Sequence, residues 1–267
     1  MESTRTITPT GPVAPWMGGK RLLAKTIAAR IEAVDHQLYA EPFVGMGGVF
    51  LRRRQAPPVE VINDYSQDLA NLFRILQRHY PQLLDTLRFQ LTSRADFTRL
   101  CAVDPNTLTD LERAARFLYL QRLSFGGKIE GRTFGVRYKD AARFNLTTLE
   151  PKLAEVHERL AGVTIECLPF EKFIPRYDRP TTLFYIDPPW WGHENDYGKE
   201  MFSRDDFARL KGLLSNLKGR FIMSLNDHPE VRNLFDEFTI EEVETTYSVG
   251  GGKHIKGVTE VLIFNEG

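Results

Sequence analysis

The residues best suited to chemistry in this 267-residue chain are Asp187-Pro188-Pro189-Trp190. They follow Thr182-Leu183-Phe184-Tyr185-Ile186, a β-branched and aromatic run that predicts a buried strand. Proline fixes φ and has no backbone N–H, so the turn after the strand is rigid and its carbonyls remain available as acceptors. A carboxylate, a carbonyl and an aromatic ring at the end of a strand can together bind a planar base that carries an exocyclic amino group.

A glycine-rich turn lies further upstream, in Glu41-Pro42-Phe43-Val44-Gly45-Met46-Gly47-Gly48. It follows a predicted short strand, 37–40, and its glycines allow the backbone to turn sharply and to approach a ligand closely. The next predicted strand, 59–62, ends at Asn63-Asp64, where an acid is placed to bind ribose hydroxyls. The pattern is not G-x-G-x-x-G, so we expect an adenosyl pocket without a diphosphate site.

A third motif, Pro15-Trp16-Met17-Gly18-Gly19-Lys20, precedes both. It opens a predicted helix, because apolar residues recur at helical spacing from Leu23 to Val34. Trp16 and Lys20 flank a Gly-Gly turn. This arrangement suits an aromatic edge and a cation that reach a ligand from the start of a helix.

Together the three motifs resemble those of the Dam-type (D12 class) DNA adenine-N6 methyltransferases. Their order fits the α-group of amino-methyltransferases, and the segments 222–227 and 259–263 match as well. The resemblance implies an α/β fold, namely a Rossmann-like S-adenosylmethionine-dependent methyltransferase fold with a helical and hairpin target-recognition insert. It also implies transfer of a methyl group from S-adenosylmethionine to the N6 amino group of an adenine flipped out of duplex DNA.

The resemblance assigns roles to particular residues. Asp187 and the Pro188 carbonyl accept the two amino N–H bonds of the adenine, and Trp190 stacks on the base. The implied catalytic residues are Asp187, Pro188, Pro189 and Trp190. The implied cofactor-binding residues are Trp16, Lys20, Glu41, Phe43, Gly45, Gly47, Asp64 and Asp187.

The charges predict one basic segment in a neutral chain. The sequence has 35 Lys and Arg against 35 Asp and Glu, yet residues 71–147 carry 13 basic against 7 acidic residues. A basic segment is expected where one face of a protein meets phosphate, although chance scatter of surface charge fits equally well. With the resemblance, we assign 1–67 and 148–267 to the catalytic domain and 68–147 to the DNA-binding insert.

The insert contains a predicted helix from Thr109-Asp110 to Leu123, followed by an alternating, glycine-containing stretch that predicts a hairpin. The candidate DNA contacts in it are Arg122, Lys128, Arg132, Arg137 and Lys139. Arg52-Arg53-Arg54 lies outside the insert, and we interpret it as a solvated helix face rather than a DNA patch. The recognition sequence is not evident from these residues.

One residue departs from the family pattern, because Trp190 stands where the family usually has tyrosine. Both rings can stack on a base, but the alternatives of a cytosine-N4 or an RNA adenine substrate remain open. A catalytically silent binding protein is a third alternative. A cytosine-C5 mechanism is disfavoured, since neither Cys101 nor Cys167 lies in the Pro-Cys pair that it needs, and we expect both to be small core residues.

The remaining expectations concern partners and location. No run of about 18 apolar residues occurs, so no membrane partner is expected. The two cysteines lack metal-ligand spacing and suit a reducing compartment, so we expect no metal and a cytoplasmic location. The expected partner is double-stranded DNA, and a cognate restriction endonuclease is a candidate second partner.

Overall fold

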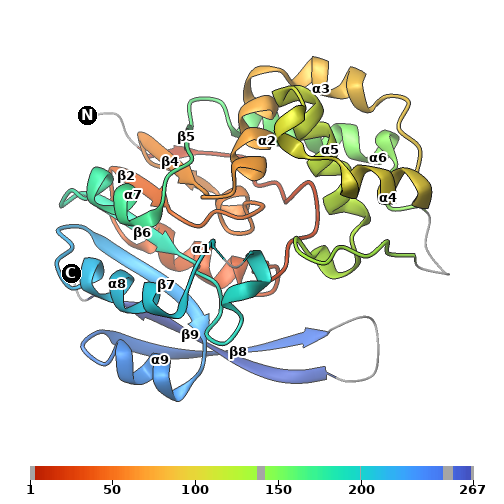
Figure 1. Cartoon of the computed structure of the whole chain (residues 1–267). Helices are drawn as coiled ribbons and strands as arrows, with labels where there is room; N and C mark the ends of the chain where they lie inside the picture. The colour runs from red at the N-terminus through yellow and green to blue at the C-terminus, as the bar shows by residue number, and fades with distance from the viewer. Residues whose placement is uncertain (1–3, 137–141, 199, 249–254, 266–267) are drawn as a thin grey trace.

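The computed structural model describes residues 4–136, 142–198, 200–248 and 255–265. A seven-stranded sheet runs through the molecule in the order β5-β4-β2-β6-β7-β9-β8 (Figure 1). The first five of these are parallel, and β9 is antiparallel to both β7 and β8. The strands are β2 (Leu38–Glu41), β4 (Val59–Asn63), β5 (Thr164–Glu166), β6 (Thr182–Ile186), β7 (Arg220–Asn226), β8 (Thr239–Ser248) and β9 (Ile255–Phe264). The predicted α/β fold is therefore confirmed.

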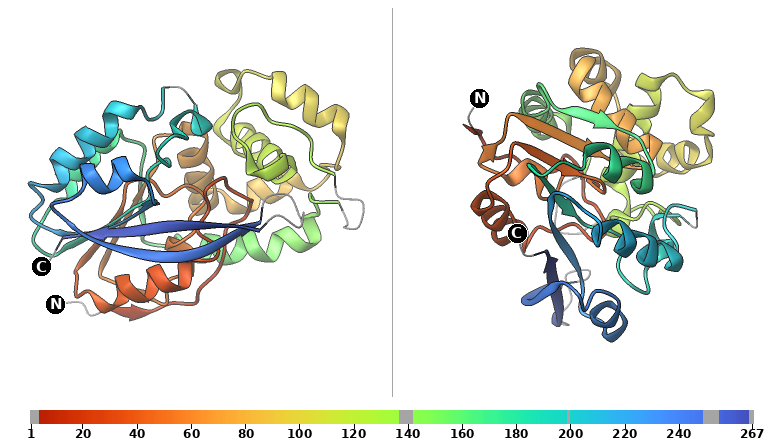
Figure 2. Two further views of the ribbon diagram at one scale, coloured as in Figure 1. Left: turned by 90° about the horizontal axis from the view of Figure 1, so that it is seen from below. Right: turned by 90° about the vertical axis from the view of Figure 1, so that its left-hand side faces the viewer.

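The sheet is covered on both faces, because its central strands alternate between two apolar cores. In β6, Leu183 and Tyr185 join one core, while Phe184 and Ile186 join the other. Helix α1 covers the first face, and α7, α8 and α9 cover the second (Figure 2). These helices are α1 (Ala24–Ala33), α7 (Phe170–Tyr177), α8 (Arg204–Leu214) and α9 (Pro229–Leu234). This double burial explains the continuous apolar run of β6.

A group of five helices stands beside the sheet (Figure 1). The helices are α2 (Gln67–Arg78), α3 (Tyr80–Leu87), α4 (Arg94–Ala102), α5 (Asp110–Leu123) and α6 (Leu146–Arg159). Helix α5 packs on α2, α3 and α4, and α6 packs on α2 and α3. The helical group thus continues through α6, beyond the expected insert boundary at 147, and the boundary itself stays a prediction.

The predicted helix of the insert begins and ends where its capping residues indicate. The Thr109 side chain accepts a bond from the Glu112 backbone, and the Glu112 carboxylate accepts a bond from the Thr109 backbone. This reciprocal pair satisfies two donors that a helix start leaves open. After α5, a short helix η3 (Phe125–Gly127) is followed by one antiparallel bridge, between Ser124 and Phe134. The described part of the predicted hairpin is therefore held by a single bridge.

Short elements complete the chain. They are β1 (Arg5–Thr6), η1 (Phe50–Arg52), β3 (Gln55–Ala56), η2 (Pro105–Thr107) and η4 (Glu194–Tyr197). Strands β1 and β3 form a separate two-stranded sheet. In the described part of the chain, no helix is both long and apolar enough to cross a membrane.

The interpretation of Arg52-Arg53-Arg54 as a solvated helix face is wrong for Arg53. Its side chain is fully buried and pairs with Glu60, which also receives two bonds of 2.7 and 2.8 Å from Arg159. The Arg53 guanidinium lies 3.7 Å from the centre of the Tyr39 ring. A buried charge requires such partners, and here they come from the neighbouring strands β4 and β2, with Arg159 added to Glu60 from the distant helix α6.

The expectation that both cysteines are core residues is also wrong. Cys101 and Cys167 are exposed. Cys101 lies near the end of α4, and Cys167 follows β5 at the edge of the sheet. Small apolar character alone does not bury a residue whose element ends at the surface.

Candidate active site

A cavity of about 1000 Å³ lies between the carboxyl edge of the parallel strands and the helical group. The strands β2, β4 and β6 deliver Glu41, Asp64 and Asp187 to it, and α5 contributes Arg122. Strand β2 lies between β4 and β6, because the chain runs from β2 outward to β4 and β5 and then returns to β6 on the other side of β2. The strand order therefore reverses between β2 and β6. Ligands of open α/β sheets bind at such a switch point, beyond the carboxyl ends of the strands.

The cavity gathers most of the predicted site. All four residues of the catalytic set line it, as do Trp16, Lys20, Glu41, Phe43, Gly45 and Asp64 of the cofactor-binding set. Gly47 does not line it; its positive φ of 76° instead shapes the turn beside Leu51. The roles of these residues stay predictions.

Asp187 is held by side chains from two other parts of the chain. Its carboxylate lies 2.8 Å from the Lys20 ammonium and accepts a 3.0 Å bond from the Ser224 hydroxyl on β7. Tyr185 continues this chain of contacts, since its hydroxyl is 2.8 Å from Ser224 Oγ. Burial raises the pKa of Asp187 to about 6, against the opposing effect of Lys20. The carboxylate is therefore ionised at neutral pH and able to accept hydrogen bonds.

Lys20 lies between two carboxylates. Besides Asp187, its ammonium is 3.2 Å from Glu260 on β9, and Lys20 and Glu260 are only 2% and 0% exposed. Burial by itself lowers the pKa of Lys20, but Asp187 and Glu260 outweigh it and raise that pKa. Lys20 therefore stays charged and forms an ion pair with Asp187, the proposed catalytic carboxylate. Its predicted role in cofactor binding stays a prediction.

The loop after Asp187 is fixed at its far end. The Trp191 backbone donates to the Asn226 side chain at 2.9 Å and accepts from it at 3.1 Å. The Trp190 ring is half-buried, with the Lys20 ammonium 5.4 Å from its centre. Asp187 and Trp190 are thus restrained from both ends of the two-proline turn.

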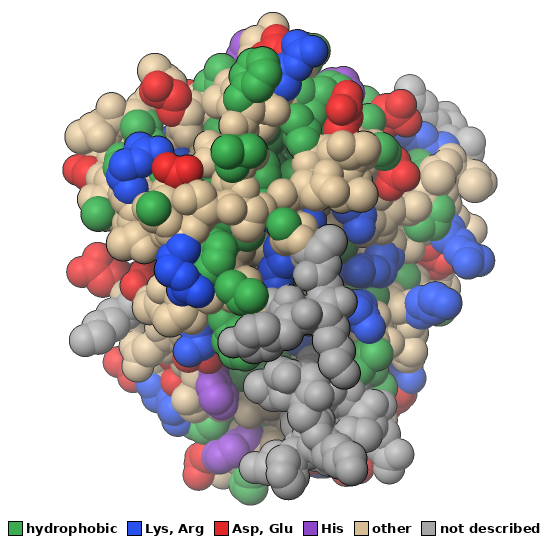
Figure 3. All heavy atoms as spheres, turned by 90° about the vertical axis from the view of Figure 1, so that its right-hand side faces the viewer, with side chains coloured by type: hydrophobic (Ala, Val, Ile, Leu, Met, Phe, Trp, Pro, Cys, Tyr) green, Lys and Arg blue, Asp and Glu red, His purple; other side chains and the backbone are tan. Residues whose placement is uncertain are grey.

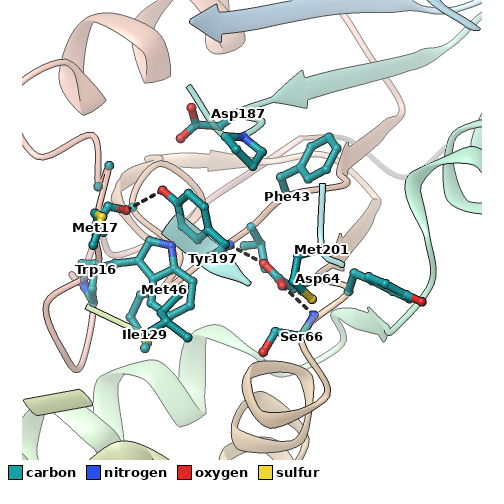
Figure 4. A pocket seen from close by; sticks show the side chains of 18 of the residues that line it. Trp16, Met17, Phe43, Met46, Asp64, Ser66, Ile129, Asp187, Tyr197 and Met201 are labelled. Atoms are coloured by element: carbon teal, nitrogen blue, oxygen red, sulfur yellow. Dashed lines mark hydrogen bonds between the residues drawn. The ribbon is translucent and has the colours of Figure 1, made fainter. Parts of the chain in front are cut away.

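Asp64 lies at the other end of the cavity and is held by the main chain. It follows β4, as predicted, and its carboxylate accepts bonds from the backbone N–H groups of Gly45 (3.0 Å) and Ser66 (2.9 Å), as Figure 4 shows. Burial raises its pKa to about 6, although the two N–H groups act in the opposite direction. Each oxygen keeps acceptor capacity for a hydroxyl of a ligand.

The glycine turn allows Trp16 to lie against it. Gly45 has φ of 48°, and a Cβ at this position would be 2.6 Å from the Trp16 indole nitrogen. The Trp16 ring contacts Phe117 of α5 edge-on at 6.5 Å and Tyr197 of η4 at 6.2 Å. The Trp16 ring therefore packs directly on the glycine backbone and forms part of the cavity lining.

Sequence reasoning missed Tyr197, which lines the cavity, and three residues that lie behind its lining. Tyr197 projects into it, and its hydroxyl donates to the Met17 carbonyl at 2.9 Å (Figure 4). Ser224, Asn226 and Glu260 lie in segments that matched the family, but no role was assigned to them. A signal was available, because a charged residue within an apolar strand, such as Glu260, must find a partner when it is buried.

Glu41 adds a further buried carboxyl. Burial raises its pKa to about 8, although the Tyr39 hydroxyl donates to it at 2.7 Å. At neutral pH Glu41 is therefore mostly protonated and able to donate a hydrogen bond into the cavity.

The predicted DNA contacts fall into three groups. Lys128 is exposed and Arg132 is half-buried, with its guanidinium 5.7 Å from the centre of the Phe117 ring. Arg122 donates to the carbonyls of Val13 and Arg143, so it ties α5 to two loops. Arg137 and Lys139 lie outside the described residues. The DNA contacts stay predictions.

No cluster suited to a metal was found. Among the residues that the structure describes, no group of three or more His, Cys, Asp or Glu side chains could hold a metal ion.

These features describe an α/β protein in which two buried aspartates face one cavity at the carboxyl edge of the sheet. Comparison with known proteins gives the family. The sequence profile of the D12 class N6 adenine-specific DNA methyltransferases matches residues 16–249, so the chain belongs to this family. It is an adenine-specific DNA methyltransferase, and the expectation from the three motifs is confirmed.

Three similar proteins span nearly the same length. The type II methyltransferase M1.LlaDCHI of Lactococcus lactis subsp. cremoris is 30% identical over 96% of this chain and 95% of its own. The type II methyltransferase M.CviBI of Paramecium bursaria Chlorella virus NC1A is 23% identical, over 88% and 90%. The retron Ec67 DNA adenine methylase of Escherichia coli is 23% identical, over 94% and 90%.

Proposed function

We propose that the methyl donor is S-adenosylmethionine and that it binds in the cavity between Asp64 and Asp187. The fit rests on the structure of the cavity itself. Asp64 offers acceptor positions for ribose hydroxyls, and the Trp16 ring, packed on the Gly45 backbone, gives the cavity an aromatic wall. The observation that carries the proposal is that one cavity joins this hydroxyl-binding acid to the carboxylate of the two-proline turn.

The proposed role of Asp187 follows from the weakness of the amino nucleophile. The lone pair of the adenine amino nitrogen is delocalised into the ring. Asp187 and the Pro188 carbonyl accept its two N–H bonds, which draws the nitrogen towards tetrahedral geometry and frees the lone pair. Trp190 stacks on the flipped base and fixes its plane.

The cofactor supplies an electrophilic methyl group on a sulfonium centre. The amino nitrogen would take the methyl group from the sulfonium, which would leave as the neutral thioether S-adenosylhomocysteine, and one amino proton would then be released to water. Asp187 stabilises the positive charge that develops on the nitrogen, because its carboxylate is ionised and fixed before the reaction.

We further propose that duplex DNA binds on the face in Figure 3, which is the side of the helical group. Lys and Arg side chains gather around the middle of this face. Exposed Lys128 suits a phosphate contact, whereas Arg132 is positioned by its contact with Phe117. Because two of the relatives are type II methyltransferases, a cognate restriction endonuclease is part of the proposal.

Methyl transfer from labelled S-adenosylmethionine to mixed-sequence duplex DNA tests the proposal. We expect labelled N6-methyladenine after digestion to nucleosides. N4-methylcytosine as the product would contradict the assignment of adenine as the target base. Label in RNA but not in DNA would contradict the assignment of duplex DNA as the substrate. Absence of binding of the labelled cofactor would overturn the assignment of the cavity.

A further inference from the structure

The position of Glu260 has no explanation in the fold alone. It is a fully buried acid within β9, flanked by the buried apolar residues Val261, Leu262 and Ile263. Burying a carboxylate is costly unless it is paired, and the partner here is the Lys20 ammonium at 3.2 Å. Lys20 in turn contacts Asp187 at 2.8 Å. Glu260 thus reaches the proposed reacting group through one intermediate side chain.

The charges of this triad explain why two acids surround one ammonium. A buried ammonium that faced Asp187 alone would neutralise it and weaken it as a hydrogen-bond acceptor. Glu260 shares the charge of Lys20, so the triad of two carboxylates and one ammonium carries a net negative charge. That net charge opposes the positive charge that develops on the adenine nitrogen during methyl transfer.

The geometry gives Glu260 a second connection to the same loop. In the sheet, Glu260 of β9 lies opposite Asn226 of β7, whose side chain holds the Trp191 backbone. Glu260 also fixes the ammonium that lies near the Trp190 ring. One cross-strand pair therefore supports both ends of the two-proline turn.

We propose that Glu260 is a positioning residue for methyl transfer, acting through Lys20 to orient Asp187 and to maintain its strength as an acceptor. This inference rests on the proposed role of Asp187. Glu260 itself does not line the cavity and touches neither substrate nor cofactor in the proposal.

Among the described residues, charged and hydroxyl groups from several elements face Asp187. They are Lys20 before α1, Glu41 of β2, Tyr185 of β6, Tyr197 of η4, Ser224 of β7 and Glu260 of β9. Of these, Lys20 lowers the pKa of Asp187 and Glu260 raises it. Removing the charge of Glu260 therefore lowers the pKa of Asp187.

The first test is Glu260→Gln, with Glu242→Gln as its control. Glu242 lies on the neighbouring strand β8, is largely exposed and pairs with Arg232. Single-turnover methylation at saturating DNA and S-adenosylmethionine should fall about 10- to 100-fold in Glu260→Gln, because small displacements of a reacting group cost rates of this order. The control should keep the wild-type rate. An unchanged rate in folded Glu260→Gln would overturn the proposal.

The second readout is the pH profile of Glu260→Gln. A positioning role through charge predicts that the acid limb of the rate moves to lower pH, while a merely structural role lowers the rate without moving that limb. An acid limb at the wild-type pH would contradict the mechanism proposed for Glu260.

A double-mutant cycle with Lys20→Met gives an independent test, and its arm within the Lys20→Met background can be measured even if Glu260→Gln alone is too unstable to assay. In the Lys20→Met background, adding Glu260→Gln should cause little further loss of rate, since the connection is already broken. Full additivity would show that Glu260 does not act through Lys20. If Asp187→Ala retained activity, the proposed function of the site would fail; if only Glu260→Gln did, this inference alone would fail.

Discussion

The two ends of the cavity hold an aspartate in opposite ways. Asp187 and Asp64 both have a pKa raised to about 6, mainly by burial. Asp187 is held by the side chains of Lys20 and Ser224, whereas Asp64 is held by two backbone N–H groups. The environment of Asp187 can therefore be changed by substitutions elsewhere in the chain, while that of Asp64 depends on the path of the backbone.

This difference agrees with the role that we propose for each aspartate, namely catalysis for Asp187 and cofactor binding for Asp64. A reacting carboxylate needs a tuned charge, which side chains supply, and a binding carboxylate needs a fixed position, which the glycine turn supplies. The following predictions test whether the two ends separate into rate and affinity as this comparison requires.

The largest expected effect is that of Asp187→Ala. Methyl transfer should fall by about 10³-fold or more, because the acceptor of the amino N–H bonds and the compensating charge are lost together. Cofactor affinity should fall far less than the rate, and the folded state should persist, as equilibrium binding and a thermal melt would show. A rate near that of the wild type would refute the role of Asp187.

Asp64→Ala should affect affinity instead of rate. The dissociation constant of S-adenosylmethionine should rise about 10- to 100-fold, since hydrogen bonds to a charged acceptor are worth about 1.5–3 kcal/mol. The rate at saturating cofactor should stay near the wild-type value. A loss confined to that rate, with normal affinity, would break the comparison.

Trp190→Ala should weaken the binding and the methylation of the flipped base more than it weakens cofactor binding. Base stacking on an aromatic side chain is worth about 1–3 kcal/mol, so we expect roughly a 10- to 100-fold loss in kcat/KM for DNA. Trp190→Tyr is the matched control and should keep most of the activity. Equal losses for both variants would argue against a stacking role.

The smallest effect near neutral pH is the dependence of kcat/KM on pH itself. Asp187 acts in its ionised form, which predominates above its pKa of about 6. At saturating cofactor, kcat/KM for DNA should therefore be level near neutral pH and fall about tenfold per unit below pH 6. Cofactor affinity should weaken over the same range, because Asp64 has a similar pKa. Glu260→Gln should move the first limb and leave the second in place.

Local patterns predicted the elements that carry the site. The strand before Asp187, the strand before Asp64 and the capped helix after Thr109 all form as expected. Each is specified by neighbours in sequence, namely an apolar run or a capping pair. The helix after Lys20 was also predicted, although α1 begins only at Ala24.

The partners of buried charges could not be predicted in the same way. Arg53 was expected at the surface, yet it pairs with Glu60 in the interior, next to Arg159 from α6. Glu260 is 240 residues from Lys20, and no local pattern connects the two. Long-range ion pairs depend on how strands are ordered in the sheet, which the spacing of motifs does not reveal.

The sequence by itself determined the reaction class, because three motifs of suitable chemistry occur in the order typical of the family. It also determined which residues lie at the carboxyl edge of the sheet, since strands and turns are specified by residues that are close in sequence. Only the tertiary structure decided how the charges are shared there. The order of the strands brings β9 beside β7 and places Glu260 beside Lys20, and burial then makes that contact strong enough to influence Asp187.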